Sequence, residues 1–225
     1  MALDEVDLCL SARSVALLGP NGAGKSTLLG LATTVLPVQR GRVAIQGSDL
    51  GRRDGRAAAR RVLGYVPQSM SLPGGWSCEE FLAYACWMHQ QTDYRAGVER
   101  ALAGVGLGDQ ANSKIRTLSG GMRQRLCVAQ ALVHRPEVLI VDEPTVGLDP
   151  LQRVRLREVL KGLDCQLVVA THLVDDVAAL AEHVVVLDAG RVVYDGSIEG
   201  LCSGTVSAAT VEDAYVALVR DTEPA

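Results

Sequence analysis

The segment that most constrains the fold is GPNGAGKST, which runs from Gly19 to Thr27. It fits the pattern G-x-x-x-x-G-K-[ST], in which glycines let consecutive backbone N–H groups curl around a phosphate. A continuous apolar run, SVALLG, precedes it, and STLLGLATTVL follows with helical spacing. A buried strand, a glycine-rich turn and a helix N-terminus form the context that phosphate binding needs. The motif therefore predicts a nucleotide site in an α/β fold rather than a chance turn.

Two side chains of this loop add chemistry to its backbone donors. Lys25 is expected to reach the β- and γ-phosphates of a nucleotide, and the Ser26 hydroxyl is expected to ligate Mg²⁺. The helix that begins here contributes unpaired N–H groups and a partial positive charge. The residues predicted to bind the phosphates are Gly19, Pro20, Asn21, Gly22, Ala23, Gly24, Lys25, Ser26 and Thr27.

An acidic motif, VLIVDEP, follows much later in the chain. Its apolar residues predict a buried strand, and Asp142 comes at the carboxyl end, where α/β sheets bind ligands. Asp142 is expected to hold the Mg²⁺ shell, as the second acid does in P-loop NTPases. Glu143 is one residue further on, so it points elsewhere and is available to polarise an attacking water.

Strand and helix patterns alternate along most of the chain. Apolar or alternating runs predict strands at 6–10, 14–20, 41–47, 62–68, 137–144 and 166–172, and a hairpin over 184–196. Helical spacing is found over 26–36, 151–163, 173–181 and 211–221. Because strands alternate with helices, the predicted fold class is α/β with a mainly parallel sheet.

The pattern changes to helices over about 71–134. Ser77 and Glu80 have the spacing of a capping box, and apolar residues follow at helical spacing. Two more helices are predicted over 95–103 and 121–133. The segment is therefore expected to be a helical insert within the α/β core.

The pentapeptide LSGGM supplies a second glycine pair far from the first. Ser119 is a good N-cap, and Gly120 and Gly121 would expose backbone N–H groups at the start of a helix. By itself, SGG before a helix is equally an ordinary cap. The phosphate-binding loop and the acidic strand alone leave kinases, GTPases and motor ATPases open, and LSGGM closes most of that gap.

Together these motifs resemble the nucleotide-binding subunit of an ATP-binding cassette (ABC) transporter. The likeness runs from Leu3 to near the C-terminus, with the P-loop, the Q-loop VPQ, the signature LSGGM, the VLIVDEP strand, the D-loop VGLD and the switch histidine of THL in the family's order. It implies the ABC ATPase fold: a P-loop NTPase core, an N-terminal antiparallel β part and an inserted helical subdomain. It also implies ATP and Mg²⁺ as cofactors and ATP hydrolysis as the activity.

The resemblance assigns roles to two more residues of the catalytic site. Gln68 would touch the Mg²⁺ and the attacking water, and would lead into the segment that senses the membrane partner. His172 would hydrogen-bond the γ-phosphate and orient it against Glu143. Without the family pattern, a lone histidine after a strand is more often a structural residue.

The resemblance also implies two kinds of partner. In this family two subunits pack head to tail, so Ser119, Gly120 and Gly121 would serve the partner's ATP. Asp149 would lie at the dimer seam. The expected partners are a second ABC ATPase subunit, in a homo- or heterodimer, and a polytopic membrane permease subunit.

Two features depart from the common family pattern. Met122 stands at the end of the signature, where glutamine is common. A methionine at this position is similar to the signature of ATPases that serve exporters of the ABC-2 kind. No aromatic residue precedes Tyr65, although family members carry an aromatic in an earlier strand that stacks on adenine. Because a base–aromatic stack contributes about 1–3 kcal/mol elsewhere, we expect weaker ATP affinity and relaxed base selectivity. A misassigned start codon would explain the missing aromatic equally well.

Composition excludes several other classes. The formal net charge is -4 with a pI of about 5.6, so no global basic field indicates nucleic acid as a partner. The six cysteines form no CxxC pair, which favours free thiols in a reducing compartment. We find no signal peptide and no apolar stretch of membrane-spanning length. We expect one ABC ATPase domain, residues 1–225, in the cytoplasm and peripheral on the inner face of the cell membrane.

The motifs leave three classes of function to consider. The leading hypothesis is an ATPase subunit that powers a membrane exporter, with docking through Trp76 to Trp87 if their side chains are exposed. The alternative is a soluble ABC ATPase not linked to transport, such as an iron–sulfur assembly ATPase. A regulatory module without hydrolysis is disfavoured, because all four expected catalytic and metal-binding residues are present: Lys25, Asp142, Glu143 and His172.

Overall fold

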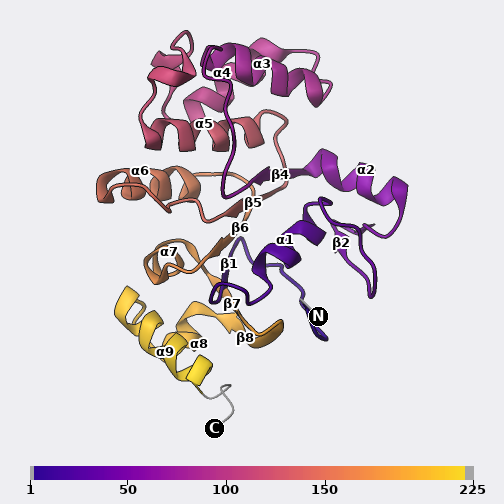
Figure 1. Ribbon diagram of the computed structural model, residues 1–225, viewed down its shortest axis with the longest axis vertical. Coiled ribbons are helices and arrows are strands. Elements are labelled where there is room, and N and C mark those ends of the chain that lie inside the picture. Colours follow the sequence, from indigo (N-terminus) through magenta and orange to yellow (C-terminus); the bar gives the residue numbers. More distant parts are fainter. Residues whose placement is uncertain (1–2, 221–225) are drawn as a thin grey trace.

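The computed structural model describes residues 3–220 and has an α/β fold built on a six-stranded sheet (Figure 1). The strand order is β4-β5-β6-β1-β7-β8, parallel throughout except for the antiparallel pair of β7 and β8. The strands are β1 (Ser14–Leu18), β4 (Leu63–Val66), β5 (Val138–Asp142), β6 (Gln166–Thr171), β7 (His183–Asp188) and β8 (Arg191–Ser197). The predicted fold class and its mainly parallel sheet are confirmed.

Helices cover both faces of this sheet. They are α1 (Lys25–Ala32), α2 (Arg53–Val62), α3 (Cys78–Met88), α4 (Tyr94–Gly104), α5 (Gly120–Leu132), α6 (Pro150–Lys161), α7 (Val174–Leu180), α8 (Ile198–Cys202) and α9 (Ala208–Arg220), with short 3-10 turns η1 (Gly108–Gln110) and η2 (Ile115–Thr117). Successive side chains of β1 point to opposite faces. Val15 packs with Leu29 of α1, whereas Ala16 packs with Val177 of α7. Both faces of β1 are thus buried, as its continuous apolar sequence predicts.

The strand predicted over 6–10 is wrong, because these residues form no strand in the described structure. Leu8 and Leu10 pack partly against the α1 side of the sheet. The alternation of apolar and polar residues over 6–10 therefore reflects burial of one side of this segment. A strand also needs a neighbour for its N–H and C=O groups. The predicted antiparallel part is present as a small hairpin of β2 (Ala44–Ile45) and β3 (Ser48–Asp49).

Helices α3, α4 and α5 follow β4 in the chain and lie together at one end of the molecule (Figure 1). The capping box is present: the Ser77 hydroxyl accepts from the N–H of Glu80, and the Glu80 carboxylate accepts from the N–H of Ser77. Their buried side chains join those of β4 and β5 in one core. The three helices predicted between β4 and β5 are therefore observed.

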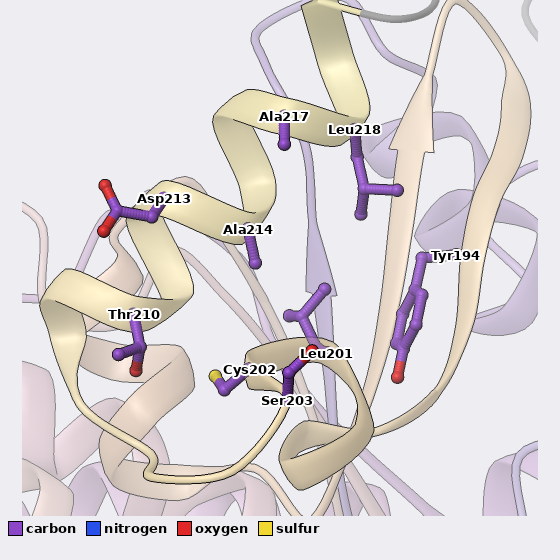
Figure 2. A pocket seen from close by; sticks show the side chains of 9 residues that line it. All are labelled: Tyr194, Leu201, Cys202, Ser203, Thr210, Asp213, Ala214, Ala217 and Leu218. Atoms are coloured by element: carbon purple, nitrogen blue, oxygen red, sulfur yellow. The ribbon is translucent and has the colours of Figure 1, made fainter.

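The C-terminal part carries the predicted hairpin, which turns at Ala189 and Gly190, both with positive φ. Helix α9 begins before the predicted start at 211, and the predicted last residue, Asp221, lies outside the described residues. Helix α9 packs on α7 and α8. An open groove of about 460 Å³ lies between α8, α9 and β8, with Tyr194 and Leu218 among its lining residues (Figure 2).

Surface features follow the sequence. The arginines of α2 are exposed or half-buried and lie on a solvated helix. All six cysteines are free; Cys78, Cys86 and Cys127 are buried, and Cys9 is exposed. No helix within residues 3–220 is long and apolar enough to cross a membrane.

Candidate nucleotide-binding site

The loop between β1 and α1 requires glycine for two different reasons. A Cβ on Gly19 would lie 2.3 Å from the carbonyl oxygen of Leu187, so no larger residue fits without displacing β7. Gly24, the N-cap of α1, has φ 105°, where L side chains are strained. These glycines let the backbone pass close to an anion placed at the N-terminus of α1.

Lys25 lies at the base of this loop, and its side chain is largely buried. Its Nζ donates to the carbonyl oxygen of Gly19 at 2.5 Å and to that of Pro20 at 3.1 Å. Burial lowers the pKa of the ammonium, and the carboxylates of Glu143 and Asp142 partly oppose that shift. Because charged phosphate oxygens are stronger acceptors than neutral carbonyls, the amine is placed to exchange these contacts for a bound phosphate.

Two adjacent carboxylates stand at the end of β5. Asp142 is the last residue of the strand, and Glu143 follows with φ 49°, an uncommon backbone conformation for a side chain other than glycine. Both residues are buried. Burial, and then the charge of Glu143, raise the pKa of Asp142, whereas Lys25 acts in the opposite direction.

The Glu143 carboxylate is held by the residues that end β6. His172 Nδ1 lies 2.8 Å from Glu143 Oε1, and the Thr171 hydroxyl donates to Glu143 Oε2 at 3.3 Å. The backbone N–H of Glu143 donates to the carbonyl oxygen of Ala170 at 2.8 Å. Thr171 is fully buried, whereas the His172 side chain is 44% exposed. One carboxylate is thereby fixed between two neighbouring parallel strands.

These groups meet in one cleft of about 180 Å³. Its lining residues are Pro20, Asn21, Gly22, Gly24, Lys25, Ser26, Thr27, Gln68, Asp142 and Glu143. Gly19 and Ala23 are buried and do not line the cleft. His172 is brought to the cleft by its contact with Glu143. The structure therefore brings together the loop, both acids, the glutamine and the histidine that the sequence singled out.

The cleft suits a magnesium ion in its donor chemistry. Ser26, Gln68 and Asp142 present a hydroxyl, an amide and a carboxylate oxygen, the hard ligands that Mg²⁺ prefers. The two buried acids also lie side by side, and a cation would relieve the repulsion that raises the pKa of Asp142. Within residues 3–220, no cluster of three or more His, Cys, Asp or Glu side chains forms a separate metal site.

The signature residues lie elsewhere. Ser119 caps α5, and its hydroxyl accepts from the N–H of Met122 at 3.3 Å. A second hollow of about 90 Å³ is lined by Ser119, Gly121, Met122, Arg125, Gln152 and Arg155. It shares no lining residue with the first cleft. Gly121 approaches Gln152 so closely that a Cβ on the glycine would overlap the Gln152 amide.

Asp149 also has a local role, that of a helix cap, which is typical of an aspartate directly before a proline. Its carboxylate caps α6 by accepting from the N–H of Gln152 at 3.0 Å, directly before Pro150 at the first turn. Sequence reasoning also missed Thr171, Arg125, and Gln152 as neighbours of the two hollows. The only available signal for Thr171 was its place as the threonine of THL, at the end of an apolar strand.

Fold and cleft define the class as a P-loop nucleotide-binding protein. The sequence profile described as ABC transporter matches residues 3–146, so the chain belongs to the ABC transporter family. The P-loop, the acidic end of β5 and the separate signature helix α5 agree with that membership.

Curated relatives and solved structures agree with this assignment. The linearmycin resistance ATP-binding protein LnrL of Bacillus subtilis is 36% identical, over 84% of this chain and 62% of the relative. The cobalt import ATP-binding protein CbiO of Rhodobacter capsulatus is also 36% identical, over 90% of this chain and 75% of the relative. The chain thus spans less than two thirds of the length of LnrL.

The fold is shared with a solved ATP-binding cassette described as dimeric, in a post-hydrolysis state and bound to ADP and Pi. The identity is 27% and the TM-score 0.76, over 87% of this chain and 90% of that one. The predicted ABC ATPase fold is confirmed by this similarity.

Proposed function

We propose that this chain is the ATP-binding and ATP-hydrolysing subunit that powers a membrane exporter. The observation that carries the proposal is the Glu143 carboxylate, which lines the phosphate cleft and lies 2.8 Å from His172 Nδ1. A carboxylate there can take the proton of a water that attacks the γ-phosphate of ATP. The alternative is a soluble ABC ATPase not linked to transport.

The other residues of the cleft bind and orient the substrate. Lys25 and the N–H groups of its loop bind the β- and γ-phosphates. Ser26, Gln68 and Asp142 would hold Mg²⁺, which when bound would neutralise phosphate charge. His172, fixed by Glu143, holds the γ-phosphate in line with the attacking water. Negative charge on the γ-phosphate oxygens shifts during hydrolysis, and the Lys25 ammonium and the loop N–H groups already face these oxygens. The protein therefore needs little rearrangement to stabilise the transition state.

A second subunit completes the site. Ser119, Gly120 and Gly121 form the N-terminus of α5 in a hollow separate from the cleft, so this subunit's own ATP does not explain them. We place them on the ATP of a partner ABC ATPase subunit, identical or related, with Asp149 at the seam. The dimeric form of the structural relative supports this arrangement. ATP then closes the dimer, and hydrolysis reopens it.

An aromatic surface on α3 is the proposed docking site for a polytopic permease subunit. Trp76, Tyr84, Trp87 and Met88 are all exposed, and Trp87 is 68% exposed. The Tyr84 ring contacts Trp76 edge-on at 5.7 Å and stacks on Trp87 at 5.8 Å between centroids. Contiguous exposed aromatic surface of this kind is typical of protein interfaces.

We also propose a domain organisation and a cellular location for the chain. Residues 1–225 act as one ABC ATPase domain, with 71–134 as the helical subdomain that carries the aromatic surface. The subunit is cytoplasmic and peripheral on the inner face of the cell membrane through its permease. Met122 favours export over import, whereas identity alone does not, because the linearmycin resistance protein LnrL and the cobalt import protein CbiO are both 36% identical to this chain.

The hydrolytic half is tested with Glu143→Gln. We expect the variant to bind ATP as the wild type does and to lose about 10²–10⁴-fold in hydrolysis, the usual contribution of a general base. Glu137→Gln is the matched control, because Glu137 is an exposed acid at the opposite end of the same strand. Substantial residual hydrolysis in Glu143→Gln would remove this residue from its role.

The transport half is tested by affinity capture of the tagged chain from detergent-solubilised native membranes. Recovery of a polytopic membrane protein at near-equal stoichiometry supports the permease partner. Loss of that protein in Trp87→Glu, with hydrolysis retained, locates the docking site. Recovery of soluble partners alone supports the alternative of an ATPase not linked to transport.

A further inference from the structure

A buried carboxylate outside the cleft joins three segments of the fold. Asp176 is fully buried, and its Oδ2 accepts from the Thr145 hydroxyl at 2.5 Å. Its Oδ1 accepts from Nε of Arg157 at 2.7 Å, and the Arg157 guanidinium also forms an ion pair with it at 2.5 Å. Both oxygens of Asp176 therefore have partners.

Each of the three segments leads from a residue of the proposed site. Thr145 follows Glu143 by two residues, in the turn between β5 and α6. Asp176 lies in the first turn of α7, which begins two residues after His172. Arg157 lies on α6, the helix that Asp149 caps. One carboxylate thus connects the general base, the switch histidine and the helix at the proposed dimer seam.

The energetics indicate that this connection is rigid. A buried carboxylate is strongly unfavourable unless it is paired and hydrogen-bonded. Arg157 supplies the charge, and the buried Thr145 supplies the last donor, so no side chain of the three can move alone without leaving a buried polar group unpaired.

Glu143 is the residue that needs such support. Its φ of 49° is uncommon for a residue other than glycine, and such conformations persist where the surroundings over-determine them. The β6 side holds it through Ala170 and Thr171. On the α6 side, the chain leaving Glu143 is anchored at Thr145.

We infer that Asp176 is a positioning residue that sets the geometry of the Glu143–His172 pair by anchoring Thr145 and α7 to one point. This rests on the proposed ATPase function, because it concerns the same site. Asp176 does not line the phosphate cleft, so it acts on the site through Thr145 and α7. Because Arg157 of α6 is bonded to Asp176, a displacement of α6 would move both Glu143 and His172.

Thr145→Val tests the link, because it removes the hydroxyl while keeping the side-chain shape and leaves the Arg157–Asp176 pair in place. Thr145→Ser restores a hydroxyl. Thr33→Val is the matched control: Thr33, the C-cap of α1, is also buried, donates to the Leu29 carbonyl oxygen at 2.7 Å and lies outside the Asp176 cluster. All four proteins are compared as full chains, with their thermal unfolding recorded.

We expect Thr145→Val to lower kcat for ATP hydrolysis by about tenfold, as small misplacements of catalytic groups do, with KM for ATP unchanged. Thr145→Ser should recover most of the rate, and Thr33→Val should keep it at equal or lower stability. A wild-type kcat in Thr145→Val, or an equal loss in Thr33→Val, would overturn the inference.

A second readout does not depend on turnover. The chain has four histidines, so the imidazole NMR signal of His172 can be assigned by substitution. We expect this signal to shift in Thr145→Val and to stay in place in Thr33→Val; an unchanged signal in both refutes the positioning role. If the wild type hydrolyses no ATP, the proposed function fails, and the histidine signal still decides the inference.

Discussion

Three glycine-to-alanine substitutions should change stability in opposite directions although the chemical change is the same. At Gly19, an added Cβ lies 2.3 Å from a backbone oxygen of β7. At Gly22, nothing lies within 4 Å, but φ is 87°. At Gly120, nothing lies within 4 Å and the backbone belongs to α5. The three substitutions therefore test three separate effects: a steric clash at Gly19, backbone strain at Gly22 and helix propensity at Gly120.

The magnitudes follow from these causes. Gly19→Ala must separate the loop from β7, and overpacking of this kind costs about 1–3 kcal/mol. Gly22→Ala costs about 1 kcal/mol, the penalty of a left-handed conformation for an L residue. Gly120→Ala stabilises by about 0.5 kcal/mol, because alanine loses less conformational entropy in a helix. The expected order of stability is Gly120→Ala, wild type, Gly22→Ala, Gly19→Ala.

Urea unfolding without nucleotide, followed by far-ultraviolet circular dichroism, measures these differences. With a slope of about 2 kcal/mol per molar urea, Gly19→Ala should lower the midpoint by about 1 M and Gly22→Ala by about half as much. The reasoning is refuted if Gly19→Ala unfolds at or above the midpoint of Gly22→Ala. It is equally refuted if Gly120→Ala is destabilised as much as either loop variant.

Further predictions concern groups outside the cleft. Burial, together with the neighbouring His89, lowers the pKa of His134 from 6.5 to about 4, so the unfolded chain binds the proton first as pH falls. We expect the free energy of unfolding to fall by about 2 kcal/mol between pH 6.5 and 4, a figure reduced because the ring is partly exposed. His134→Gln should remove this pH dependence, as urea unfolding at several pH values would show. Burial raises the pKa of Cys127 to about 11. A thiol reagent at pH 8 should therefore modify exposed Cys9 long before Cys127, as peptide mass mapping would show. Trp87→Ala should change unfolding free energy by less than about 0.5 kcal/mol, whereas Leu82→Ala on the buried face of α3 should cost about 2–5 kcal/mol.

The parts of the fold that the sequence predicts are those in which local pattern and tertiary environment agree. The run SVALLG is apolar on both faces because β1 is buried on both faces, and the spacing of Ser77 and Glu80 is sufficient to define a helix start. The strand over 6–10 failed because alternation reports which side is buried and carries no information about a partner strand. The loop and the acidic strand end were predictable for the same reason, since their chemistry is local.

The contacts that complete the site were not predictable, because they join distant segments. A threonine and an aspartate at positions 145 and 176 look like ordinary turn and helix residues. Their partnership depends on the packing of α6 against α7, which no local pattern contains. Likewise, the positive φ of Glu143 has no sequence marker, because glutamate is not among the residues that favour this conformation.

Several residues of the proposed mechanism also stabilise the fold, and this decides how substitutions should be interpreted. Ser119 and Asp149 are helix caps in this subunit, and their removal costs about 1 kcal/mol whatever they do at a dimer seam. An alanine at either position changes stability and assembly together. Asp149→Ser keeps a capping oxygen and removes only the charge, so it separates the two roles.

The same argument makes the hydroxyl of Thr145, rather than the carboxylate of Asp176, the informative group to remove within the buried cluster. Removing the hydroxyl leaves the ion pair intact, whereas removing the carboxylate leaves Arg157 without a counter-charge in a site where little water reaches it.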